Sequence, residues 1–108
     1  MLPGKFAEEP PAFEPIMPVR VPEYTLSEHA LFQMKRRGVG QDVVRAILLS
    51  PEQRVQIRPG RVVFQSRVSM GEDAKEYLVR VFVDVDCDPA EVVTVYRTSK
   101  ISKYWRAP

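Results

Sequence analysis

The stretch Glu76-Tyr-Leu-Val-Arg-Val-Phe-Val-Asp-Val-Asp86 decides the fold, because it has the pattern of a long β-strand. Apolar side chains occupy every second position, at Tyr77, Val79, Val81, Val83 and Val85. A period of two places these side chains together on one face of a sheet. Residues 76–86 are therefore predicted to form the strongest strand, with one buried face.

Three further strands are predicted around this one, over residues 54–58, 61–69 and 91–98. The connections between consecutive strands are short, and the first contains the turn signal Pro59-Gly60. Short connections join antiparallel neighbours. The sequence thus predicts a four-stranded antiparallel sheet.

Two helices are predicted ahead of the strands. The first begins at a capping box, Thr25-Leu-Ser-Glu28, with Thr25 as the N-cap, and ends at the natural C-cap Gly38. The second covers residues 41–49 and ends before Pro51. Helices segregated from a run of strands indicate an α+β fold, in which the two N-terminal helices pack on the sheet.

Residues 1–23 contain six of the ten prolines. Proline removes backbone donors, so we interpret this segment as an extended or disordered tail and residues 24–108 as a single domain. The segment lacks the apolar core of a signal peptide, and no apolar run is long enough to span a bilayer. One cysteine, Cys87, fits a reducing compartment. We therefore expect a cytoplasmic protein without a membrane segment.

The charge of the chain is unevenly distributed. The net charge is +2, and residues 1–23 carry −2, so the remainder carries +4. A basic domain suits a partner that bears phosphates, such as RNA, although an ordinary solvated surface accounts for the same charges.

The second face of the sheet is predicted to carry polar and aromatic groups. Alternation places Arg67, Arg80 and Tyr96 on it, and Lys100 follows the last strand. Arginine and lysine can hold phosphates, and aromatic rings can stack on bases. These four residues are the RNA-binding candidates, although antiparallel sheets commonly leave one face wet without any such role. In the same region, Tyr104 and Trp105 are expected either to stack on bases or to pack back on the domain.

His29 is the only histidine, so any histidine chemistry depends on it. Helical spacing aligns His29 with Gln33 and Arg36, while Arg37 points closer to the core. A histidine can move protons and arginines can hold a scissile phosphate, so His29, Arg36 and Arg37 are the catalytic candidates for a metal-free ribonuclease. The alternative is a histidine that bonds a neighbouring loop and fixes the helix.

No cofactor or metal site is expected. The sequence has no phosphate-cradling glycine loop and no zinc pattern. The run Asp84, Asp86, Asp88 lacks the glycine and the glutamate of a calcium loop.

The run Ser27-Glu-His29-Ala30-Leu-Phe-Gln-Met34-Lys-Arg-Arg37-Gly38-Val39, followed by Asp42-Val-Val and Ser50-Pro51-Glu52, resembles the bacterial domain-of-unknown-function family 4258. The resemblance extends to the closing strand Val93-Thr-Val-Tyr96 and covers residues 24–104 in rough terms. Gly40 departs from the family pattern, which often has Ser or Thr there as the N-cap of the second helix. The layout is also similar to small toxin ribonucleases of the RelE and BrnT kind. This likeness implies a RelE-like fold, messenger-RNA cleavage and a small antitoxin-like protein as partner.

Three hypotheses follow from the sequence. The chain is a toxin-like, metal-free endoribonuclease, a non-catalytic RNA-binding module that uses the open sheet face, or a protein-interaction module. In the last case a partner segment covers that face or pairs with an edge strand.

Overall fold

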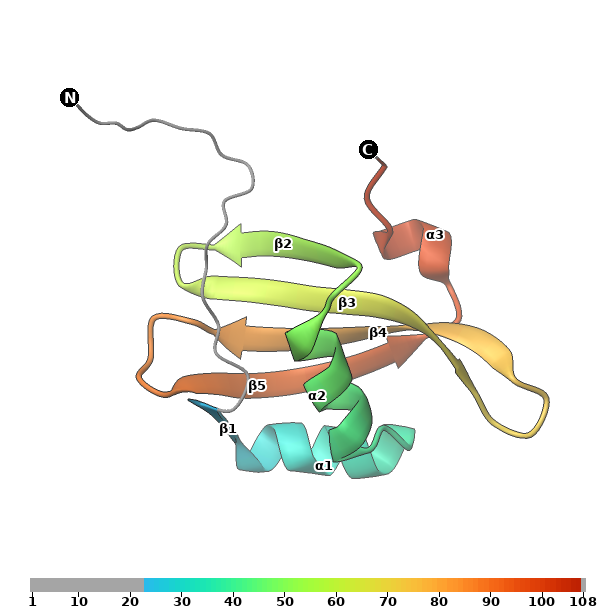
Figure 1. Cartoon of the computed structure of the whole chain (residues 1–108), viewed down its shortest axis with the longest axis horizontal. Coiled ribbons are helices and arrows are strands. Elements are labelled where there is room, and N and C mark those ends of the chain that lie inside the picture. The colour runs from blue at the N-terminus through green and yellow to red at the C-terminus, as the bar shows by residue number, and fades with distance from the viewer. Residues whose placement is uncertain (1–22, 108) are drawn as a thin grey trace.

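The computed structural model describes residues 23–107. The tail predicted over residues 1–23 lies, except for Glu23, outside the described residues. The elements follow one another along the chain as shown in Figure 1. They are β1 (Tyr24–Leu26), α1 (Glu28–Arg37), α2 (Gln41–Leu49), β2 (Gln53–Arg58), β3 (Arg61–Met70), β4 (Lys75–Asp84), β5 (Ala90–Thr98) and α3 (Ile101–Tyr104).

The strands form one mixed sheet in the order β1-β5-β4-β3-β2. Four of them, β2 to β5, pair antiparallel as predicted, but β1 pairs parallel with β5, with Leu26 opposite Val92. The predicted α+β class is therefore confirmed, whereas the prediction of a sheet of four antiparallel strands is wrong. A strand of three residues is too short to show an alternation, and its pairing depends on a strand more than 60 residues away.

Helix α1 begins later than the sequence predicted, because Ser27 and not Thr25 is its N-cap. The Ser27 hydroxyl accepts a hydrogen bond from the Ala30 amide at 2.9 Å and donates one to the Val93 carbonyl at 3.1 Å. The Ser27 amide donates to the Val92 carbonyl at 3.0 Å. One residue thus caps the helix and fastens it to β5. The predicted C-cap is confirmed, since Gly38 adopts a φ of 68°.

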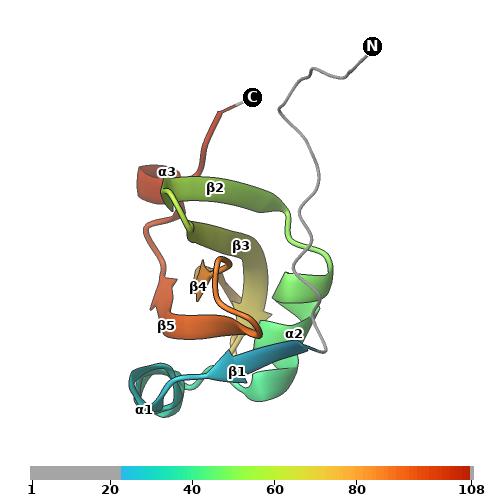
Figure 2. The same ribbon diagram turned by 90° about the vertical axis from the view of Figure 1, so that its left-hand side faces the viewer.

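The core lies between the two longer helices and one face of the sheet. Ala30 and Met34 from α1 and Ile47 from α2 pack against the valines that alternate along β4. Figure 2 shows α2 on one side of the curved sheet, α1 beside β5, and α3 on the opposite side. Within residues 23–107, none of the helices is both long and apolar enough to cross a membrane.

The chain after β5 turns back across the second face of the sheet. Helix α3 and residues 105–107 lie there, and Val63, Gln65 and Leu78 beneath this region are fully buried. The face that the sequence described as open is therefore partly covered by the protein's own C-terminal segment. Alternation within a strand predicts which side chains share a face, but it does not show which later segment covers them.

Candidate functional site

A row of arginine and tyrosine side chains crosses the second face of the sheet. The Arg37 guanidinium carbon lies 4.7 Å from the centre of the Tyr96 ring. The Tyr96 ring meets Tyr104 edge to face, with 5.9 Å between ring centres. The Arg80 guanidinium carbon lies 4.4 Å from the centre of the Tyr104 ring. We name Arg37, Tyr96, Tyr104 and Arg80 the arginine–tyrosine cluster.

Each member of the cluster comes from a different element. Arg37 is in the last turn of α1, where its Nε donates a hydrogen bond of 3.2 Å to the Gln33 carboxamide. Tyr96 follows the buried Val95 in β5, so its side chain points to the opposite face. Tyr104 ends α3, the short helix that follows β5 after a turn. The whole fold is therefore required to assemble the cluster.

Arg80 is a partly buried cation without a carboxylate partner among residues 23–107. Its Nε donates a hydrogen bond of 2.9 Å to the side-chain oxygen of Gln65, and its guanidinium also faces the Phe82 ring at 5.3 Å. Burial lowers the pKa of Arg80 below its ordinary value, and the nearby charge of Arg106 contributes in the same direction. An arginine stays protonated nevertheless. A desolvated cation without a counter-ion favours the binding of an anion.

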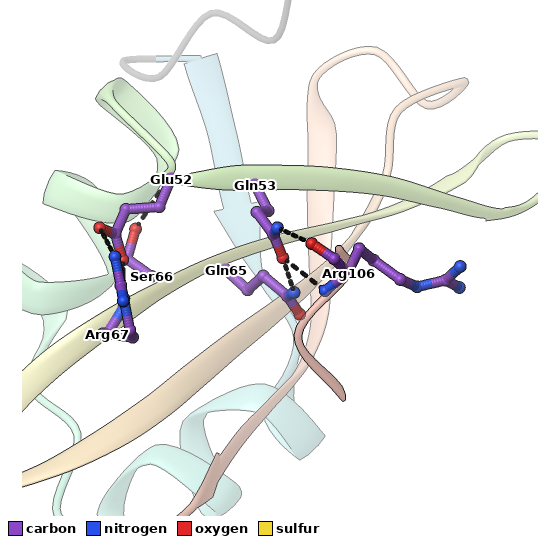
Figure 3. A network of polar contacts seen from close by, with 6 residues as sticks. All are labelled: Glu52, Gln53, Gln65, Ser66, Arg67 and Arg106. Atoms are coloured by element: carbon purple, nitrogen blue, oxygen red, sulfur yellow. Dashed lines mark hydrogen bonds and ion pairs between the residues drawn. The ribbon is translucent and has the colours of Figure 1, made fainter. Parts of the chain in front are cut away.

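The buried Gln65 connects Arg80 to the C-terminal segment. Its Nε2 donates to the Gln53 side-chain oxygen at 2.8 Å and to the Tyr104 carbonyl at 3.3 Å. Gln53 in turn bonds both backbone groups of Arg106, donating at 2.6 Å and accepting at 3.1 Å. Figure 3 shows the part of this network formed by Gln65, Gln53 and Arg106. Through these bonds Gln65 fixes Tyr104 over the sheet and holds the Arg80 guanidinium between the sheet and the Tyr104 ring.

The hydroxyl of Tyr104 lies among positive charges. Hydrogen bonding with Tyr96 lowers the pKa of Tyr104 from its ordinary value, and the positive charges of Lys103 and Arg80 also lower it. The ring therefore combines a face for stacking with a hydroxyl in a cationic environment. The sequence left open whether Tyr104 stacks on bases or packs back on the domain. The structure shows it packed against Tyr96 and Arg80, and base stacking stays a prediction.

Arg67, a predicted RNA-binding residue, is engaged elsewhere. Its guanidinium forms a two-point ion pair with Glu52, at 2.9 Å and 3.1 Å, and lies 4.3 Å from the centre of the Trp105 ring. The hydrogen bonds from Arg67 lower the pKa of the Glu52 carboxyl. Figure 3 shows that this pair stands apart from Gln65 and Gln53. Arg67 is thus neutralised by a carboxylate, unlike Arg80.

The other predicted site residues lie on exposed surface. The side chains of His29 and Arg36 are exposed on α1 and make no hydrogen bond within residues 23–107. The bond to a neighbouring loop that would give His29 a structural role is thus not seen in this part of the chain. Lys100 is exposed at the start of α3, where its amide donates to the Thr98 hydroxyl at 3.0 Å. Of the predicted residues, the structure brings together Arg37, Tyr96 and Arg80.

Sequence reasoning missed the role of Gln53. A glutamine in an edge strand has no distinguishing signal, because its partner Arg106 lies 53 positions later. Gln65 lies two positions before Arg67 and so shares its face of the strand, but nothing in the pattern indicated that it would be fully buried. Within the described part of the chain, no group of three or more His, Cys, Asp and Glu side chains could hold a metal ion.

Comparison with known proteins places the domain in a family. No curated protein and no solved structure matches the chain significantly. The family model described as "Domain of unknown function (DUF4258)" matches residues 26–97, from the last residue of β1 almost to the end of β5. The match includes Arg37, Arg80 and Tyr96 and ends before Tyr104. The chain therefore belongs to the DUF4258 family of domains.

Proposed function

We propose that this protein binds single-stranded RNA in the cytoplasm, on the arginine–tyrosine cluster. The observation that carries the proposal is Arg80, a partly buried guanidinium with no carboxylate partner in residues 23–107 and with the rings of Phe82 and Tyr104 close to it. Arginine binds phosphate oxygens through its planar fork of donors. The cluster therefore has the chemistry of a phosphate site bordered by stacking surfaces.

The aromatic rings favour a single strand over a duplex. Bases in a duplex are already stacked on one another, whereas those of a single strand can stack on Tyr96 or Tyr104. Arg37 and Arg80 stand at the two ends of the row with the two rings between them, which suits bases stacked on the rings and phosphates on either side. The described domain is also basic, since the acidic excess lies within residues 1–23.

We further propose that the bound RNA is cleaved without a metal, which is what a likeness of the layout to RelE and BrnT toxins would imply. His29 and Arg36 are exposed on α1, the helix that supplies Arg37 to the cluster. The imidazole of His29 would accept the 2′-hydroxyl proton while the 2′-oxygen bonds to phosphorus and the bond to the 5′-oxygen breaks. Arg36 and Arg37 would stabilise the added negative charge, and water would protonate the leaving oxygen. The products would be a 2′,3′-cyclic phosphate and a 5′-hydroxyl.

A titration with fluorescent RNA tests the binding proposal. Single-stranded oligouridine, oligoadenosine and a fully paired RNA hairpin are titrated with the full chain, with EDTA present throughout. We expect fluorescence anisotropy to show binding of the single strands, weaker binding of the hairpin and an affinity that falls as salt rises. Absence of binding at low salt, or a clear preference for the hairpin, would refute the proposal.

A further inference from the structure

Within residues 23–107, strand β2 pairs with no other strand along its outer edge. It is the outermost strand in the order β1-β5-β4-β3-β2, and its hydrogen-bonded partner is β3. Four of its six residues are exposed, including Ile57, whose exposed fraction is 49 %. An edge strand presents free backbone donors and acceptors to any strand that approaches it. At six residues, β2 is long enough to support such a pairing.

A groove lies beside this edge. It has a volume of about 650 Å³ and is lined by β2 and by residues 105–107 of the C-terminal segment. Val55 and Trp105 give it apolar surface, and Arg54 and Arg106 give it positive charge. The two bonds between the Gln53 side chain and the Arg106 backbone hold the segment next to the strand. The groove is therefore built into the folded domain.

The charges of the groove indicate the chemistry of its occupant. Within residues 23–107, Arg54 and Arg106 form no ion pair, and the groove is lined by no acidic residue. A second copy of this chain would bring a second Arg54 and a second Arg106 to the same place, so like charges oppose self-pairing. An extended segment with carboxylates would instead complement both arginines.

We propose that the edge of β2 and its groove bind an extended acidic segment of a partner protein, which adds to the sheet as a sixth strand. Backbone groups of the segment pair with those of β2, an apolar side chain lies on Val55 and Trp105, and carboxylates face Arg54 and Arg106. None of the residues that line the groove belongs to the arginine–tyrosine cluster. A protein segment fits it better than RNA because RNA cannot continue the backbone ladder of a strand.

Three synthetic peptides of about seven residues, the length of an ordinary strand, test the proposal. The first alternates glutamate and valine, the second alternates lysine and valine, and the third is the glutamate peptide with N-methyl groups on alternate amides. Each is titrated into isotope-labelled full chain and followed by amide chemical shifts. We expect the glutamate peptide to shift the signals of the β2 amides and the Trp105 indole. The lysine peptide loses the charge match and the N-methylated peptide loses the backbone hydrogen bonds, so each should bind at least about tenfold more weakly.

Two matched variants separate this inference from RNA binding. Arg54→Glu should weaken the glutamate peptide about tenfold or more and leave oligouridine affinity near that of the parent protein. Arg45→Glu makes the same charge change on the exposed face of α2 and should alter neither. Equal binding of the N-methylated peptide, shifts outside β2 and the groove, or no binding would overturn the proposal. Loss of RNA affinity in Arg54→Glu without peptide binding would also overturn it and assign the edge to RNA.

Discussion

At the scale of single residues, the site depends on a buried amide that has no charge of its own. Gln65 accepts a hydrogen bond from Arg80 and donates to both Gln53 and Tyr104, so three segments meet at one side chain. The sequence placed Arg80 and Tyr96 on the correct face because strand alternation is a local property. The neighbours of these residues depend on how the C-terminal segment folds back, which no local pattern indicates.

Replacement of Gln65 by leucine should destabilise the protein by about 1–3 kcal/mol, because Arg80 loses its acceptor and Gln53 loses a donor in a buried place. Chemical unfolding measures the effect. Gln56→Leu is the control: its side chain is exposed in the adjacent strand, so the change should stay within about 0.5 kcal/mol. Equal effects of the two substitutions would show that the Gln65 network contributes nothing.

His29→Gln should reduce RNA cleavage by about 100- to 10,000-fold if His29 is the general base, since that is the usual loss when such a group is removed. Because His29 is exposed, the melting temperature should remain close to that of the parent protein. Cleavage is followed with EDTA present, by the appearance of a cyclic phosphate end. Unchanged cleavage in the variant would remove His29 from the mechanism.

At the scale of elements, helix α1 is held to the sheet both by its N-cap and by its apolar face. Ser27 bonds both to the helix and to β5, which the sequence could not show because Val92 and Val93 lie more than 60 residues away. The sequence predicted Thr25 as the N-cap, and Ser27, two positions later, belongs to the same preferred residue types. The pairing of β1 with β5 decided between them, since it keeps Thr25 in an extended strand.

Ser27→Ala should therefore lower the free energy of unfolding by about 1–2 kcal/mol, the upper part of the range for a lost N-cap. Thr25→Ala removes the hydroxyl that the sequence favoured, and its exposed side chain predicts a change within about 0.5 kcal/mol. Denaturant unfolding of both variants checks the assignment. A larger loss in Thr25→Ala would reverse it.

The ion pair between β3 and β4 should make stability depend on pH. Arg61 holds the Asp84 carboxylate at 2.7 Å and 3.0 Å, and these hydrogen bonds lower the pKa of Asp84. The folded protein therefore binds this proton less tightly than the unfolded chain does. The stabilisation is present above the ordinary aspartate pKa and is lost as pH falls through the lowered value.

Because both side chains are partly exposed, the effect should be about 0.2–1 kcal/mol. Asp84→Asn should lower stability near neutral pH and flatten its decline between neutral and acidic pH. Thermal melting across that range measures both. An unchanged pH profile in Asp84→Asn would show that this pair does not contribute.

At the scale of the whole molecule, the sequence identified the α+β class and the four longer strands, because periodicity and turn signals are local. It could not predict the parallel strand β1 or the return of residues 101–107 across the sheet, because both depend on contacts between distant segments. The arginine–tyrosine cluster belongs to this second category. Its four residues come from α1, β4, β5 and α3, and only the assembled fold brings them together.

The affinity of single-stranded oligouridine for Arg80→Gln and Arg45→Gln, measured against salt, tests the central claim most directly. Both variants lose one positive charge, but Arg80 belongs to the cluster and Arg45 lies exposed on α2. We expect Arg80→Gln to weaken binding about tenfold or more and to reduce the salt slope by about one, as for a lost phosphate contact. Arg45→Gln should bind like the parent protein. Equal affinities for the two variants would contradict the claim that RNA binds at the arginine–tyrosine cluster.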